Sequence, residues 1–159
     1  MGASERDAGR RVVLEGLAEA GLAADEVSPD IWMTALSGER KRTLPVVLRL
    51  ADRSLHVRAL LCGALDEGHA EVYRFLLERN QYARAVHFAL DEAGDVLLTG
   101  QVPLAVLDAD GFDRLLGVVL TVADEVYFTV LRRGFAGYVE VEQRWREQVG
   151  LPPNPLSSS

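Results

Sequence analysis

The chain has 159 residues, a length typical of one globular domain. Hydrophobic residues make up 48% and charged residues 26% of the sequence, which excludes collagen-like, coiled-coil and wholly disordered chains. Seventeen basic residues against 24 acidic ones give a net charge of −7, so we expect no nucleic-acid partner.

The sequence also indicates a compartment. Its single cysteine, Cys62, cannot form an intramolecular disulfide, and its first residues lack the apolar segment of a secretory signal. No apolar run reaches the roughly 18 residues that suggest a membrane span. We therefore expect a cytoplasmic protein without a membrane partner.

In chain order, the first predicted element is a helix over residues 5–22. Ser4 can cap it, acidic residues occupy its first turn, and apolar residues follow at helical spacing. Residues 31–36 and 43–50 predict two strands, because both are rich in apolar and β-branched residues. The short polar segment 37–41 between them predicts a hairpin turn.

Apolar and polar residues alternate over 54–60, which predicts a strand with one buried face. The apolar spacing then changes to that of a helix over 66–80. Residues 85–90 and 96–102 predict a second hairpin, whose turn contains Gly94 where a positive φ is favoured.

A long helix is predicted from Asp108 to Arg133, followed by a fourth helix over 138–149. Residues 151–159 are rich in proline and serine and lack apolar periodicity, so we expect a disordered tail. Residues 1–150 are then a single domain with the order α-β-β-β-α-β-β-α-α. Short turns make the strands antiparallel, which predicts an α+β fold: a two-layer α/β sandwich of a five-stranded sheet and helices packed on it.

Several fragments in this order resemble the YbjN family. They span roughly residues 30–147 and are 54–62, 71–80, 88–95 with 100–104, and 113–117 followed by Ala123-Asp124. The resemblance implies a fold similar to the type III secretion chaperones, with a five-stranded antiparallel sheet and a cytoplasmic homodimer. The family has no established enzymatic activity, and its members are described as sensory-transduction regulators or chaperone-like proteins.

No residue pattern indicates catalysis, a metal or a cofactor. The three histidines, His56, His69 and His87, fall on different predicted elements, whereas a zinc site needs clustered ligands. Cys62 has apolar neighbours, which favours a buried thiol over a nucleophile. The two acidic residues at 108–110 are typical of a helix cap, and the three at 91–95 are typical of a solvated turn. The glycines form no phosphate-binding loop.

Five residues are candidates for partner binding. Arg40 and Lys41 belong to a basic run at the predicted hairpin tip. Leu120 and Tyr127 lie on a second apolar row of the long helix, beside the row that faces the core, and Trp145 lies late in the last helix. A second apolar row predicts a homodimer unless other helices of the same chain cover it.

The function predicted from these observations is a non-enzymatic protein-interaction domain, a chaperone-like or regulatory adaptor of the YbjN family that binds a polypeptide partner. An alternative is a small-molecule-binding domain or small enzyme, with a pocket between sheet and helices lined by His56, Arg58 and His87. A third possibility is a domain that only dimerises within a larger assembly.

Overall fold

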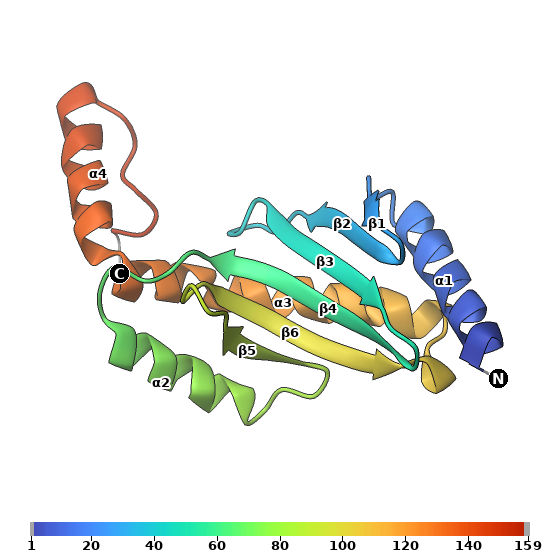
Figure 1. The fold of residues 1–159 in the computed structure, drawn as a ribbon. Coiled ribbons are helices and arrows are strands. Elements are labelled where there is room, and N and C mark those ends of the chain that lie inside the picture. Colours follow the sequence, from blue (N-terminus) through green and yellow to red (C-terminus); the bar gives the residue numbers. More distant parts are fainter. Residues whose placement is uncertain (1, 158–159) are drawn as a thin grey trace.

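The computed structural model describes residues 2–157, which form one antiparallel sheet with helices against one face (Figure 1). The elements are α1 (Gly2–Glu19), β1 (Asp25–Ser28), β2 (Ile31–Leu36), β3 (Leu44–Leu50), β4 (Ser54–Cys62), α2 (His69–Asn80), β5 (Val86–Leu90), β6 (Val96–Pro103), a short 3-10 helix (Leu104–Val106), α3 (Ala109–Gly134) and α4 (Ala136–Val149). The predicted α+β class is confirmed.

The strands lie in the order β1-β2-β3-β4-β6-β5, and every neighbouring pair is antiparallel. β2, β3 and β4 follow one another as predicted. The chain then passes through α2 to the far edge, and β6 returns between β4 and β5. The sheet edges are therefore β1 and β5.

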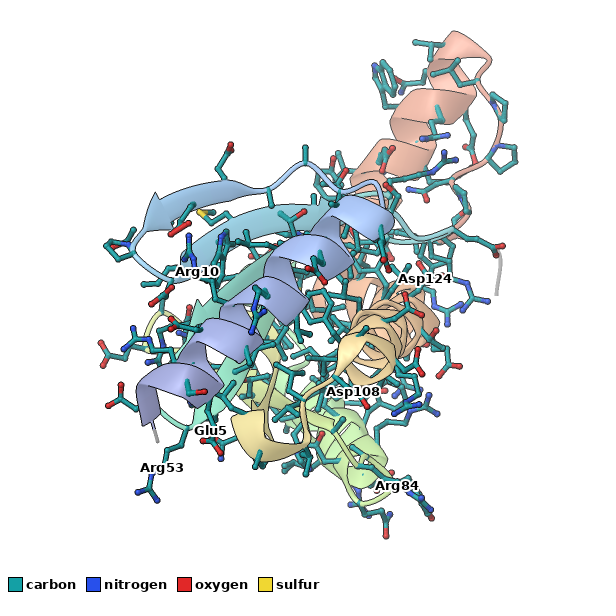
Figure 2. All side chains as sticks on the ribbon, turned by 90° about the vertical axis from the view of Figure 1, so that its right-hand side faces the viewer. Glu5, Arg10, Arg53, Arg84, Asp108 and Asp124 are labelled. Atoms are coloured by element: carbon teal, nitrogen blue, oxygen red, sulfur yellow. The ribbon has the colours of Figure 1, made fainter. Side chains whose placement is uncertain are left out.

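The sheet has six strands, so the prediction of five is wrong. The missed strand is β1, whose four residues are all exposed. Three of them pair with Met33, Trp32 and Ile31 of β2. An exposed, partly acidic strand has no buried face and hence no apolar alternation to reveal it. Arg10 on α1 holds it through Glu26, at 2.6 Å, and Figure 2 shows Arg10 pointing from α1 toward this edge.

Alternation of side chains separates the two faces of the sheet. In β4, Leu55, Val57 and Ala59 are buried under the helices, while Arg58 is exposed on the other face. The buried residues of α1, α2, α3 and the inward strand positions form one core cluster. No helix within residues 2–157 covers the opposite face, which carries Arg49 and His87 among its exposed residues.

The long helix α3 is covered on both sides by its own chain. Leu116 and Ala123 on its second apolar row are 6% and 0% exposed, and Leu120 packs against the core. α3 contacts α1 along one part and α2 along another, so this helix buries more than one stripe. Helices of the same chain therefore cover most of the second apolar row, so this row does not require a second copy.

The described part of the tail, residues 151–157, makes polar contacts with α4. Asn154 is 3% exposed: its side-chain amide donates to Glu142 at 2.8 Å, and its backbone amide donates to the side chain of Gln143 at 2.8 Å. The carbonyl of Pro152 accepts from Arg146 at 3.1 Å. Polar contacts to α4, which apolar periodicity cannot reveal, hold the described part of the tail, and residues 158 and 159 lie outside the described residues.

Candidate binding surface

The tip of the β2–β3 hairpin is fixed against α3. Asp124 Oδ1 accepts the backbone amides of Arg40 at 2.8 Å and Lys41 at 2.7 Å. Gly38 donates its amide to the carbonyl of Lys41 at 2.9 Å and leaves room for the Asp124 carboxylate, because a Cβ at position 38 would lie 2.5 Å from Oδ1. The two basic side chains therefore start from a defined position.

From this tip, the cationic groups reach aromatic rings of α3. Lys41 Nζ lies 4.9 Å from the centre of the Tyr127 ring, and the guanidinium carbon of Arg40 lies 5.8 Å from the centre of the Phe128 ring. Both distances suit cation–π contacts. Three of the predicted partner-binding residues, Arg40, Lys41 and Tyr127, thus lie close together.

A cavity of about 460 Å³ opens beside this cluster. It lies where the hairpin tip, the end of β4, the last turns of α3, the start of α4 and the tail meet. Its lining residues are Lys41, Cys62, Gly63, Asp66, Tyr127, Leu131, Phe135, Tyr138, Val139 and Leu156. The lining is mostly apolar with a few polar groups, as is typical of binding sites.

Burial shifts the pKa of three groups that line the cavity, Lys41, Tyr127 and Cys62. It lowers the pKa of Lys41, an effect that the neighbouring Cys62 partly opposes. It raises the pKa of Tyr127 and raises that of the Cys62 thiol to about 11. The buried thiol predicted at Cys62 agrees with its exposed fraction of 8%.

The start of α4 is set by the loop before α2. The backbone amides of Asp66 and Glu67 donate to the carbonyl of Gly134, at 3.0 and 3.1 Å. A Cβ at residue 134 would lie 2.6 Å from Leu65 Cδ2, so a side chain there would displace Leu65. Glu67 also accepts the amide of Gly137 at 2.8 Å. The chain turns at this point, and α4 projects from the body of the molecule (Figure 1).

α4 carries an exposed apolar stripe that begins at the cavity. Its members recur every three or four residues and lie on one face of the helix; they are Tyr138, Val141, Trp145 and Val149, exposed by 67%, 57%, 53% and 52%. We call them the α4 stripe. Tyr138 belongs to both the stripe and the cavity lining, so the two form a continuous surface.

The other predicted residues have separate positions. Trp145 lies on the α4 stripe beyond the cavity, whereas Leu120 packs against the core and does not line it. The sequence analysis assigns no binding role to Asp124 or Tyr138. The available signal for Asp124 was weak: an acidic residue directly beside the apolar row of a helix.

A second apolar groove, of about 320 Å³, lies between α2 and the edge strand β5. Leu77 and Leu90 in its lining are 68% and 45% exposed. The side chain of Asn80 closes part of the strand edge, donating to the carbonyl of Phe88 at 3.1 Å and accepting its amide at 2.8 Å. The groove is therefore open to an apolar contact, while the centre of the strand edge is occupied.

The residues suggested for a small-molecule pocket do not lie between sheet and helices. His56 and His87 lie on the uncovered face of the sheet, in a hollow of about 340 Å³. Burial, followed by the charge of Arg49, lowers the pKa of His56, whose Nε2 lies 2.9 Å from Ser54 Oγ. Arg58 lies on the same face and is exposed.

The described residues form neither a metal-ion cluster nor a membrane-spanning helix. Within residues 2–157, no three histidine, cysteine or acidic side chains come together as a metal-ion site would require. None of the helices in this range has the length and apolar character needed to span a membrane. Asp108 caps α3, accepting the amide of Gly111 at 2.7 Å, and Asp91 accepts the amides of Ala93 and Asp95 within its turn.

An antiparallel sheet with helices on one face makes this an α+β protein, and its fold is similar to that of the type III secretion chaperones. A chain of the ExsC–ExsE complex matches with a TM-score of 0.57 and 24% identity, over 80% of this chain and 93% of that one. A chain of the ExoU–SpcU complex of Pseudomonas aeruginosa gives 0.53 and 19%, over 71% and 93%. A chain of the complex between the Yersinia pestis chaperone SycH and a fragment of YscM2 gives 0.51 and 18%, over 72% and 96%.

The chain belongs to the YbjN family. The family profile, described as "Putative bacterial sensory transduction regulator", matches residues 10–132 and ends before α4. An uncharacterised protein of Mycobacterium tuberculosis is 40% identical over 119 residues, which cover 75% of this chain and 65% of that protein. An uncharacterised protein of Mycobacterium leprae is 39% identical over 123 residues, covering 77% and 67%.

Proposed function

We propose that this chain is a non-enzymatic protein-interaction domain of the chaperone-like or regulatory-adaptor kind, which acts in the cytoplasm and binds a polypeptide partner. The observation that carries the proposal is the continuous apolar surface formed by the cavity and the α4 stripe. Tyr138, Val141 and Trp145 are all more than half exposed. A soluble chain rarely exposes such a stripe unless something binds it.

The structural neighbours support a polypeptide as the partner. The ExsC–ExsE, ExoU–SpcU and HopA1–SchA structures are each complexes of two proteins, the last a chaperone–effector complex. An amphipathic helix whose apolar face is free is also a common element of peptide recognition. We expect residues 1–150 to act as one domain in this role.

The test is affinity capture from cells that naturally make the chain, comparing two matched variants. Val141→Glu places a charge on the α4 stripe, and Val106→Glu makes the same change at a 68% exposed valine elsewhere. Both should fold, because both side chains are exposed. We expect Val141→Glu to lose a protein that the natural chain and Val106→Glu capture. Capture of the same proteins by all three chains would contradict the proposal.

We also propose that the chain forms a homodimer through the α2–β5 groove. Its exposed Leu77 and Leu90 make an apolar edge that a second copy can cover, and a symmetric contact of one groove with itself closes at two chains. Light scattering during size exclusion tests this. Leu77→Glu should yield a folded monomer, whereas Leu14→Glu, at a 42% exposed leucine of α1, should remain a dimer. A monomeric natural chain at micromolar concentration would refute the proposal.

A further inference from the structure

The cavity of about 460 Å³ beside the hairpin tip is lined by one cationic group, Lys41, in mostly apolar surroundings. Lys41 is half-buried, and its ammonium contacts the Tyr127 ring. Within the part of the chain that the structure describes, no carboxylate lies within ion-pair distance of Lys41 Nζ. Asp66 lines the same cavity outside that distance. A partly desolvated cation without a counter-charge favours an anionic ligand.

The hairpin tip beside the cavity has the opposite charge to the molecule as a whole. The chain carries a net charge of −7, but Arg40, Lys41 and Arg42 follow one another here, against two carboxylates: that of Glu39 in the same turn and that of Asp124, which accepts the amides of the tip. A narrow cationic site on an acidic protein favours a partner whose negative charge is local. It does not suit a long polyanion, which needs a broad basic surface.

The rest of the surface is apolar and extends well past Lys41. Leu131, Phe135, Val139 and Leu156 line the cavity, and the α4 stripe continues from Tyr138 along the helix. The cavity volume of about 460 Å³ falls in the usual range for a ligand pocket. A small inorganic anion would leave these apolar groups uncovered.

We propose that the partner of this surface is an acidic, apolar polypeptide segment, in which one carboxylate side chain pairs with Lys41 and flanking apolar side chains fill the cavity and cover the α4 stripe. The inference rests on the proposed function and adds the chemistry of the partner. Charge complementarity at the hairpin tip determines where the acidic residue lies. The apolar lining determines what flanks it.

The experiment uses two pools of fluorescein-labelled synthetic peptides with blocked ends. One pool has Asp or Glu flanked on both sides by Leu, Val, Phe and Trp; the other has Asn or Gln in place of the acid. Fluorescence anisotropy measures binding to the full chain and to three variants. Lys41→Met removes the charge but keeps the apolar stem, and Lys41→Arg keeps the charge. The control, Arg53→Met, removes an exposed charge in the turn between β3 and β4, away from the hairpin tip and the cavity lining.

We expect the natural chain, Lys41→Arg and Arg53→Met to bind the acidic pool about tenfold more tightly than the amide pool, as for a charge-assisted hydrogen bond. Lys41→Met should bind both pools equally. The acidic preference of the natural chain should also weaken with added salt, a readout that needs no variant. Equal binding of both pools by the natural chain, or an acidic preference that survives in Lys41→Met, would overturn the inference.

Two further arms separate this inference from the proposed function. If both pools bind equally and Val141→Glu abolishes that binding, the interaction surface stands and the acidic partner does not. If no pool binds and Val141→Glu captures the same proteins as the natural chain, both fail. Light scattering of Lys41→Met and competition by octanoate complete the test. A change in the oligomeric mass of Lys41→Met would show that a second copy of the chain occupies the surface. Binding of octanoate without binding of peptide would show that the ligand is a small carboxylate. Either result overturns the inference.

Discussion

Asp124 accepts a hydrogen bond from the backbone amide of Lys41 at 2.7 Å, although 83 residues separate the two in the chain. The same carboxylate oxygen accepts the amide of Arg40 at 2.8 Å. One side chain of α3 therefore determines where the β2–β3 hairpin tip lies relative to the cavity.

Asp124→Ala should loosen this tip. Two backbone amides lose their acceptor, which we expect to cost about 1–3 kcal/mol in the free energy of unfolding. Hydrogen exchange at the amides of residues 40 and 41 should accelerate. The control is Asp113→Ala, an exposed aspartate of the same helix, which should stay within about 0.5 kcal/mol of the natural chain. Equal stability of the two variants would contradict this prediction, because it would show that water accepts the two amides as well as the Asp124 carboxylate does.

Replacing either of two helical glycines, Gly16 or Gly117, by alanine should change the free energy of unfolding, in opposite directions. A Cβ at Gly16 would overlap the ring of Phe112, which is fully buried, so Gly16→Ala should lower the free energy of unfolding by about 1–3 kcal/mol. A Cβ at Gly117 on α3 would meet nothing within 4 Å. Gly117→Ala should therefore raise stability by about 0.5–1 kcal/mol through helix propensity. Urea denaturation of both variants is the measurement, and a stable Gly16→Ala would show that α1 can shift away from α3.

The sequence allowed the prediction of those elements whose burial follows a regular period. Leu55, Val57 and Ala59 alternate with polar residues, so β4 and its buried face could be predicted. β1 could not, because all four of its residues are exposed and its pairing depends on Arg10 from another element. A strand that is held by distant polar partners has no local pattern.

The candidate site could be predicted one residue at a time but not as a site. Lys41 and Tyr127 were singled out for separate reasons, a basic run and a second apolar row. Their contact at 4.9 Å depends on Asp124, whose partners lie more than 80 residues away in sequence. Long-range polar contacts of this kind are determined by the fold as a whole, and periodicity contains no information about them.

Acid should remove the contribution of Asp30 to stability. Burial raises the pKa of this carboxyl, but hydrogen bonds from Arg10 and Arg6 outweigh it, and its pKa lies below the ordinary 3.8. The folded chain then binds protons less readily than the unfolded chain, so the stabilisation is present above pH 3.8 and is lost as the pH falls below it.

Asp30→Asn should therefore be less stable than the natural chain at pH 7, and the difference should shrink as the pH falls below about 4. Asparagine tolerates the positive φ of 62° at this position, so the substitution mainly removes the charge. The control is Asp52→Asn, since the Asp52 side chain is 91% exposed and contacts only Arg6 among these groups. Urea denaturation from pH 3 to 7 measures both, and a difference that is constant with pH would contradict the linkage.

Cys62 should react slowly in the folded chain. Burial raises the pKa of its thiol to about 11, with Lys41 opposing and Asp95 adding to the shift. A thiol with a pKa two units above the ordinary value of 9.0 has about 100-fold less thiolate at pH 8, and the thiolate is the reactive form. We expect the reaction with a disulfide reagent such as DTNB to be at least about 100-fold slower in the native chain than in urea. Lys41→Met should slow the native reaction further, because it removes the positive charge that favours the thiolate, while Arg42→Met should not. A native rate within tenfold of the unfolded rate would show that Cys62 is open to solvent, and that the cavity wall beside Lys41 opens readily.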